Sequence, residues 1–249
     1  MKVFITSRVK YVAALVFWLM VWQAASGAVA NEVMLVSPAS AFSRLFELSM
    51  AAAFWRTIGF SLSRIIAGFS LAMIMGVILA AFSAWSNLTH VILAPVFDII
   101  KSVPVALFVI LALFWLHSSH LSLFISFITV LPIVYFKVFE GIKNAEPRLL
   151  EMAYIFKISP LRKIRHIYFI AVVPHIIASA NAGLSFAFKA GISAEIIGIV
   201  RDTIGFNLHT ASNLLQTRDI FAWTIAIIIL GSIMERIFLA FLGRMSRWQ

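Results

Sequence analysis

Six apolar stretches, separated by short polar segments, follow one another along the chain. Each is close to or longer than the roughly twenty residues that an α-helix needs to cross a bilayer. The pattern predicts an all-α integral membrane protein with a single membrane domain over residues 1–249. The predicted transmembrane helices are 11–30, 58–84, 99–116, 121–139, 167–200 and 220–242.

Polar and proline-marked segments set the connections between these spans. Asn87 to Lys101 is too polar and too proline-marked to span, so we expect an inner connection there, leading into the third span. Pro95 and Pro104 are expected to break regular helix in this region. The outer loop from Asn31 to Thr57 contains an amphipathic piece at 42–54. We expect Pro174 to kink the fifth span.

The N-terminus is compatible with two interpretations. Basic residues precede an apolar run, and Ala28-Val29-Ala30 imitates a signal-peptidase site, so a cleaved signal peptide is one of them. The other is an uncleaved first span, which we prefer because residues 11–30 are long enough to cross a bilayer.

Composition excludes an ordinary soluble domain. The chain is 62% hydrophobic and 12% charged, with a mean hydropathy of +1.01. In a soluble protein, a net charge of +10 would suggest binding to nucleic acid. Here the positive charge is concentrated in the loops predicted to lie on one side of the membrane. The candidate outer loops contain no Lys, and their four Arg are balanced by four acids. We therefore expect both termini on the cytoplasmic side and no nucleic-acid partner.

A charged segment, 140–166, interrupts the apolar pattern between the fourth and fifth spans. Seven Lys or Arg lie between Lys137 and Arg165, against three acids, so the segment is expected in the cytoplasm. Pro147 and Ser159-Pro160 predict two helix starts. The first helix would present an apolar face, formed by Leu149, Met152, Ala153 and Phe156. A helix lying on lipid headgroups is the alternative interpretation.

The same segment resembles the cytoplasmic coupling loop of permease subunits from binding-protein-dependent ABC importers. The signature of that loop is Glu-Ala-Ala, three residues, Gly, and about nine residues to Ile-x-Leu-Pro. The matches are Glu151, Ala153 and Ile167. The departures are Met152 for the first Ala, Lys157 for the Gly, and Phe169-Ile170 for Leu-Pro. In place of the glycine, Ser159-Pro160 is expected to supply the helix break.

Two further stretches are similar to the nitrate, sulfonate and taurine branch of these permeases. They are Phe186 to Gly198 and, more weakly, Pro95 to Trp115, so the resemblance covers roughly residues 55 to 242. It implies a type I ABC importer permease fold, two copies of this subunit, two cytoplasmic ATPase subunits and an external solute-binding protein. It also implies an ATPase-coupling helix, for which the candidate residues are Leu149, Glu151, Met152, Ala153, Phe156 and Ser159.

Small residues recur every four positions on two of the predicted spans. Such residues let helix backbones approach closely in lipid. In the second span this stripe includes a charge, so we expect its members to face protein; they are Arg64, Gly68, Ala72 and Gly76. In the fifth span Gly183 and Gly191 belong to a similar stripe, which suits packing against a neighbouring helix or a symmetry mate.

Polar residues within the fifth span are candidates for function, because a charge in hydrocarbon is costly unless paired or hydrated. We assign Ser185, Lys189, Ser193 and Glu195 to the translocation path or its gate. The alternative is structural: Lys189 would pair with Asp98 or Glu235, and Glu195 with Arg64 or Arg201.

Other function classes find less support in the residues. The chain has no phosphate-cradling Gly-x-x-x-x-Gly-Lys-Ser/Thr motif, so ATP would be bound by partner subunits and no cofactor is expected. Neither His-Glu-x-x-His nor Gly-x-Ser-x-Gly occurs, which disfavours an enzyme. His117 and His120 lack a third ligand, so no metal site is predicted. A secondary transporter or channel working without ATPases remains the main alternative.

Overall fold

The computed structural model describes the backbone of residues 2–29 and 31–245, and the side chains of residues 10, 13–29 and 31–240. Ala30, the last residue of the sequence that imitates a signal-peptidase site, lies outside the described residues. Over the described ranges the chain is helical and contains no strand. The longer helices are α1 (Lys2–Val29), α2 (Pro38–Ser49), α3 (Ala52–Trp85), α4 (Asn87–Ser102), α6 (Leu121–Lys143), α9 (Phe169–Ile197), α10 (Ile204–Asn213) and α11 (Thr217–Met245). The shorter elements are α5 (Val105–Ala112), η1 (Ser118–His120), α7 (Pro147–Ile155), α8 (Pro160–Lys163) and the π-helical turn η2 (Ile164–Tyr168).

Four helical segments of the described chain are long and apolar enough to cross a membrane. They are α3, the run Ser118–Lys143, the run Pro160–Ile197 and the first part of α11, Thr217–Ala240. The bent pair α4 and α5 makes a fifth if it counts as one span. The described apolar part of α1, Ala13–Val29, is shorter than these four.

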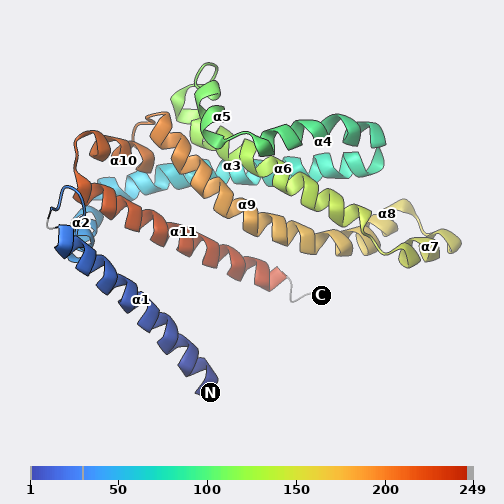
Figure 1. The fold of residues 1–249 in the computed structure, drawn as a ribbon. Helices are drawn as coiled ribbons and strands as arrows, with labels where there is room; N and C mark the ends of the chain where they lie inside the picture. Colours follow the sequence, from blue (N-terminus) through green and yellow to red (C-terminus); the bar gives the residue numbers. More distant parts are fainter. Residues whose placement is uncertain (1, 30, 246–249) are drawn as a thin grey trace.

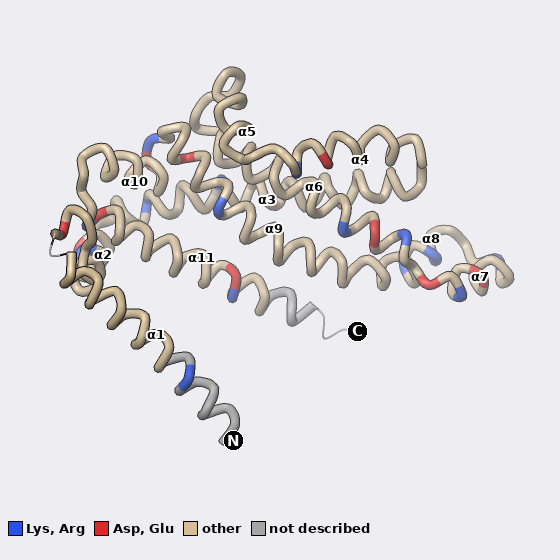
Figure 2. Tube along the Cα trace, in the orientation of Figure 1, with Lys and Arg blue, Asp and Glu red and all other residues tan. Residues whose placement is uncertain are grey.

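The elements lie between two ends of the molecule (Figure 1). The short helices α7 and α8 form one end, and α2 and α10 lie at the other. Figure 2 shows a dense group of charged residues over α7 and α8. The helix α1 runs toward α2, and α11 starts near α2 and runs toward the α7 end (Figure 1). Both ends of the described chain therefore lie away from α2.

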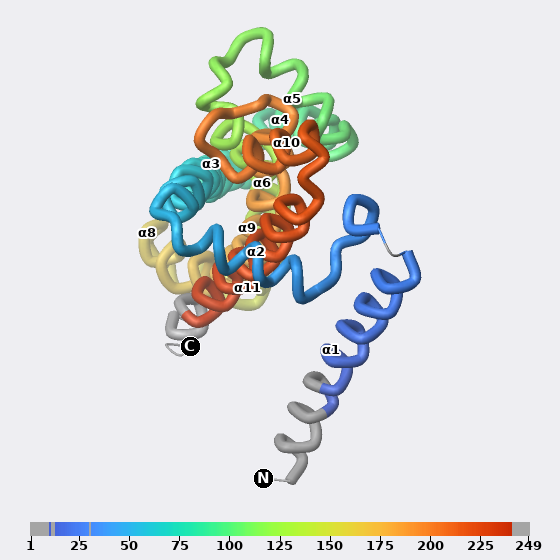
Figure 3. The backbone as a smooth tube through the Cα atoms, turned by 90° about the vertical axis from the view of Figure 1, so that its left-hand side faces the viewer, coloured from blue at the N-terminus to red at the C-terminus, as the bar shows by residue number. Residues whose placement is uncertain are grey.

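The first helix, α1, stands apart from the bundle along most of its length (Figure 3). The C-terminal part of α1 contacts its neighbours through Trp22. The Trp22 ring stacks on Phe221 with the ring centroids 5.6 Å apart, and its Nε1 donates to the Val36 carbonyl. Ser26 adds a hydrogen bond to the Leu35 carbonyl.

The third predicted span, 99–116, is broken at Pro104, as expected, whereas the break expected at Pro95 does not occur. The chain turns by 103° between α4 and α5, because Pro104 has no backbone N–H and holds Val103 in an extended conformation (ψ 132°). The expected connection from Asn87 to Lys101 is instead the helix α4, which contains Pro95 on its exposed side. It packs through Phe97 against Tyr135 of α6, with ring centroids 4.6 Å apart.

The core consists of α3, α6 and α9, whose backbones lie very close together. A Cβ placed on Gly68 of α3 would lie 2.2 Å from the Leu123 carbonyl oxygen of α6, and one on Gly76 would lie 2.7 Å from Val134. Ala72, between them, is fully buried. The predicted small-residue stripe of this helix therefore faces α6.

The small residues of α9 also face the chain's own helices and do not require a symmetry mate. A Cβ on Gly183 would meet Val130 of α6 at 2.9 Å, and one on Gly191 would meet Ile65 of α3 at 2.5 Å. At these glycines the three helices are so close together that an added side chain would clash with a neighbouring helix.

This packing predicts opposite outcomes for two glycines of the same helix. Gly68→Ala should destabilise the protein by roughly 1–3 kcal/mol, because the added methyl group meets a backbone carbonyl that cannot move aside. Gly59→Ala has nothing within 4 Å of its new methyl group and should be neutral. Thermal melting of the purified protein in detergent measures both, and equal melting temperatures would contradict the packing described.

Candidate functional site

The segment between α6 and α9 folds around a small core of its own. Ala153, which belongs to the coupling-loop signature, is fully buried and shares an apolar cluster with Ala145 and Ile167. Ile167 is the other apolar residue of that signature, so two signature residues stabilise the loop itself. Ala153 was predicted on the apolar face that the helix presents to a partner. In the structure it lies on the opposite, buried side of α7, which packs against Ile167.

The helix α7 begins at Pro147, as the sequence predicts, and ends at Ile155, with Phe156 as its C-cap. The backbone N–H of Ile158 donates to the Ala153 carbonyl and that of Lys157 to the Tyr154 carbonyl, the two bonds of a Schellman motif. This motif places Lys157 at φ 50°, a left-handed conformation that glycine adopts without steric cost. The helix break thus occurs at the glycine position of the signature and not at Ser159-Pro160; the lysine strains the backbone by about 1 kcal/mol.

A second helix starts at Pro160, again as predicted, but neither Glu146 nor Ser159 caps its helix with its side chain. After α8 the backbone passes through the π-helical turn η2 into α9. Ser159 is exposed between the two helices.

Large apolar side chains cover the outer surface of α7. We call this surface the α7 patch; it comprises Leu149, Met152, Tyr154, Ile155 and Phe156, all exposed. Charged residues on the same helix, including Arg148 and the exposed Glu151, border the patch. Exposed apolar area bordered by charges is typical of a protein-binding surface, whereas the exposed apolar residues of α3 or α11 suit lipid.

The predicted polar stripe of α9 is divided by the structure into two environments. Lys189 and Ser193 are exposed and Ser185 is half-buried, so these three lie along one outward face of the helix. Glu195 has no exposed surface. The expected partner Asp98 pairs with Lys101 instead, at 3.4 Å, and no ion pair involves Lys189 among the side chains that the structure describes.

Glu195 lies where α3, α9 and α10 meet. Its Oε2 accepts hydrogen bonds from the Ser61 hydroxyl at 2.8 Å and from the Gly205 backbone N–H at 3.3 Å. The Ser61 hydroxyl in turn accepts from the Ile204 N–H at 3.0 Å. The acid therefore holds the N-terminus of α10, where free N–H groups favour negative charge, and it contributes no exposed surface to a path.

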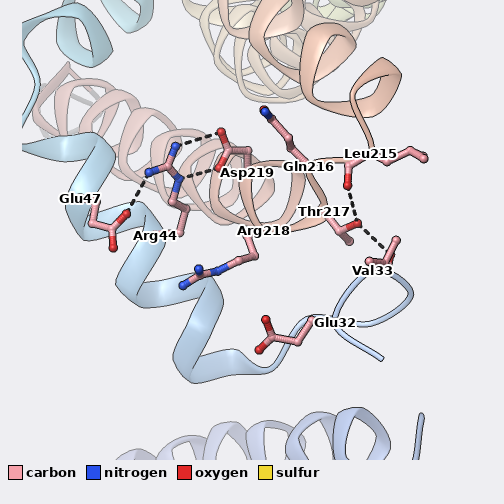
Figure 4. A pocket seen from close by; sticks show the side chains of 9 residues that line it. All are labelled: Glu32, Val33, Arg44, Glu47, Leu215, Gln216, Thr217, Arg218 and Asp219. Atoms are coloured by element: carbon pink, nitrogen blue, oxygen red, sulfur yellow. Dashed lines mark hydrogen bonds and ion pairs between the residues drawn. The ribbon is translucent and has the colours of Figure 1, made fainter. Parts of the chain in front are cut away.

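At the opposite end of the molecule, Arg44 of α2 binds Asp219 of α11 (Figure 4). Its Nε and Nη2 donate to the two oxygens of Asp219, and its Nη1 donates to Glu47 at 2.9 Å. The hydrogen bond with Asp219, followed by that with Glu47, raises the pKa of the guanidinium above its usual value. These side chains border a shallow cavity of about 390 Å³, to which Glu32 and Arg218 also contribute.

The two histidines at and beside the turn η1, His117 and His120, make local contacts. His117 Nδ1 lies 2.9 Å from the Ser119 hydroxyl, and His120 ends the turn η1. No group of three metal-ligating side chains occurs among the described residues.

Comparison with known proteins assigns the chain to a family. Residues 68–247 match the binding-protein-dependent transport system inner membrane component family. The chain belongs to this family. The match includes the core helices α6 and α9, the second half of α3, and the whole segment that carries the α7 patch.

Individual relatives agree with this family assignment. The nitrate import permease protein of Synechocystis is 28% identical over 73% of this chain and 66% of its own length. The taurine transport system permease protein of Escherichia coli is 21% identical over 91% of this chain and 84% of its own. The resemblance to the nitrate, sulfonate and taurine branch is thus confirmed.

A solved structure supports the fold. An amino acid ABC transporter crystallised with histidines superposes with a TM-score of 0.66 at 14% identity, covering 82% of this permease and 98% of that chain. The predicted type I importer permease fold is therefore confirmed.

Sequence reasoning missed two groups of residues. Tyr154 and Ile155 are among the most exposed members of the α7 patch, but the helical template selected only one stripe. Their apolar character between charged neighbours was the available signal. Ser61 and Gly205, which hold Glu195, were missed because hydroxyl and backbone partners carry no charge that a sequence pattern could match.

The Arg44 contacts predict unequal roles for its two acids. Asp219→Ala should lower the free energy of unfolding of the permease by about 1–2 kcal/mol, because it removes a partly buried bidentate pair that links α2 to α11. Glu47→Ala removes a more exposed pair within one helix and should cost at most about 0.5 kcal/mol. Thermal melting in detergent tests the order; a larger loss for Glu47→Ala would refute it.

Proposed function

We propose that this chain is the transmembrane subunit of an ATP-driven importer, that it forms the path of a small anionic solute, and that cytoplasmic ATPase subunits bind its α7 patch. The observation that carries the proposal is the patch itself. It presents exposed apolar side chains on a loop too rich in charge to enter lipid, in a chain of the binding-protein-dependent permease family.

ATPase coupling follows from what the patch can bind. Permeases of this family work with ATPase and substrate-binding partners in general. Aromatic and long apolar side chains surrounded by polar ones are typical of binding hot spots. The helix α7 leads into α9 through α8 and the turn η2, and its apolar cluster includes Ala171 of α9, so movement of a bound ATPase would act on the end of a core helix. Glu151 and Ser159 lie exposed beside the patch and would contribute polar contacts at its rim.

Topology follows from the same end of the molecule. With α7 in the cytoplasm, both termini lie on the cytoplasmic side of a prokaryotic plasma membrane, and α2 and α10 face outward. The external binding protein would then approach near Arg44 and Asp219, and two copies of the permease would enclose the path.

We assign the solute path to the face of α9 that points away from the chain's own core. Ser185, Lys189 and Ser193 lie along this face, and the lysine would attract an anion. Relatives named for nitrate and taurine transport support an anionic substrate. A neutral heterocyclic solute is the second candidate, since the hydroxyls could bind it without the charge.

Transport without ATPases is the alternative function for this chain. It would leave the α7 patch without a partner. Co-purification of a stoichiometric ATPase supports the importer, whereas ion-driven flux by the chain alone in vesicles supports the alternative.

The proposed coupling predicts the effect of a charge in the patch. Phe156→Glu should weaken ATPase binding roughly tenfold or more, because an aromatic anchor becomes an acid that must be desolvated. Met50→Glu is a matched control: Met50 and Phe156 are both 73% exposed, but Met50 lies at the opposite end of the molecule. Co-purification of the ATPase measures both variants. Equal recovery of the ATPase with the two would refute the placement.

The proposed path predicts a charge requirement at Lys189. Lys189→Glu should reduce anion uptake by about tenfold or more, since the sign of the local charge is reversed, while Lys189→Arg should retain most of it. ATPase recovery should be unchanged in both, which separates the path from coupling. Uptake of a radiolabelled anion into proteoliposomes is the measurement; full uptake by Lys189→Glu would exclude the lysine from the path.

A further inference from the structure

The chain crosses the membrane between α3 and α6 as a broken helix. Gly68 of α3 packs against Leu123 of α6, and Gly76, further along α3, packs against Val134, so these two membrane-spanning helices run in the same direction. The chain must therefore return across the bilayer between them. The bent pair α4 and α5 makes this return (Figure 1).

The bend between α4 and α5 lies well inside the hydrocarbon region. Val105, the first residue of α5, borders the same apolar cluster as Ile128 of α6. Ile128 belongs to the interior of the run Ser118–Lys143, which is long and apolar enough to cross the bilayer. The chain thus turns by 103° at a depth where the neighbouring helix continues without a break.

The backbone at this bend is irregular and only partly covered by the chain's own helices. The last backbone hydrogen bond of α4 joins the Val103 N–H to the Ile99 carbonyl, and the next one along the chain joins the Leu107 N–H to the Pro104 carbonyl. Ser102 and Pro104 are exposed. Irregular backbone does not face lipid at this depth; it is buried in protein or lines a water-filled cavity.

Two charged side chains lie beside the bend on α4. Lys101 Nζ is 3.4 Å from Asp98 Oδ1, and the side chains of Lys101 and Asp98 are 49% and 62% exposed. The same Nζ lies 4.2 Å from the centroid of the Phe136 ring of α6. A charge that faces lipid is costly, so charged side chains at this depth face a hydrated cavity or protein. The charged pair and the irregular backbone therefore exclude lipid from the same place.

The two charges favour a particular kind of ligand. A single long contact leaves further N–H donors on Lys101 and further acceptor positions on Asp98. A simple anion would bind Lys101 but would be repelled by the carboxylate beside it. A solute with both an anionic group and an ammonium group satisfies both side chains, because its anion accepts from Lys101 and its ammonium group donates to Asp98.

We propose that Asp98, Lys101 and the bend between α4 and α5 form a solute-binding site on the translocation path, and that its ligand carries an anionic group together with an ammonium group. The inference rests on the proposed function, in which two copies of the permease enclose the path. It places α4 on the path, where the sequence predicted only an inner connection.

Cysteine labelling tests whether the bend lines the path, since the chain has no cysteine of its own. Ser102 follows Asp98 by four residues and lies on the same side of α4, whereas Val96, which is 49% exposed, is two residues from Asp98 and lies on the opposite side. In lipid nanodiscs, a charged, thiol-specific reagent should modify Ser102→Cys about tenfold or more faster than Val96→Cys, because lipid suppresses the reactive thiolate. Equal rates would overturn the site.

Protection by solutes tests the class of ligand. Taurine carries both groups, and ethanesulfonate is the matched control that lacks the ammonium group. Taurine should slow the modification of Ser102→Cys at about one-tenth of the ethanesulfonate concentration, because it forms one more charge-assisted hydrogen bond. Asp98→Asn should remove this difference, and Lys101→Gln should remove protection by both solutes. Equal protection by the two solutes, or none by taurine, would refute the ligand class.

Uptake by the unmodified transporter and recovery of its ATPase test the proposed function separately. If both are present and Ser102→Cys reacts no faster than Val96→Cys, the site is wrong and the importer stands. If Ser102→Cys reacts faster and taurine protects it, but no ATPase is recovered, the site stands and ATPase coupling is wrong.

Discussion

The close approach of α3, α6 and α9 is the constraint on which the rest of the structure depends. Gly68 and Gly191 are positions where a side chain would displace a neighbouring helix, so the three backbones can meet in only one rotational setting. That setting decides which polar groups of α9 are internal. It turns Glu195 toward Ser61 and the start of α10, and it leaves Lys189 on the opposite, exposed face.

The two ends of the molecule use charge in different ways. At the α2 end Arg44 and Asp219 bind each other and hold α2 against α11, so these two charges are paired within the chain. At the other end the charges of α7 and α8 remain mostly exposed around an apolar surface. An internally paired end is suited to holding helices together. An exposed, mixed surface is suited to a partner that supplies the missing contacts.

Local signals were enough to predict much of the fold. Pro147 and Pro160 gave the correct starts of the two loop helices, since a proline fits the first turn of a helix without losing a hydrogen bond. Family signatures correctly gave the permease fold. The helix break at Pro104 was expected, but a proline does not give the angle of a break, and the sequence does not distinguish Pro104 from Pro95, which α4 tolerates.

The candidate site was less predictable, because tertiary contacts decide which side of a short helix is covered. Ala153 fits the apolar stripe of α7 as well as Phe156 does, yet it is buried because Ala145 and Ile167, from outside the helix, pack around it. Lys157 occupies a left-handed position that its side chain disfavours, so a residue preference would have placed the break elsewhere.

The π-helical turn at Ile164–Tyr168 has a consequence for how the loop is oriented. Such a turn accommodates one residue more than an α-helical turn, and each residue of an α-helix rotates the chain by about 100°. Losing a single residue here would let the backbone relax into ordinary helix and swing α7 around the axis of α9 by roughly a quarter of a circle. The length of this short turn therefore sets the direction in which the loop points around the axis of α9. In a relative with one residue fewer, the loop would point in a different direction.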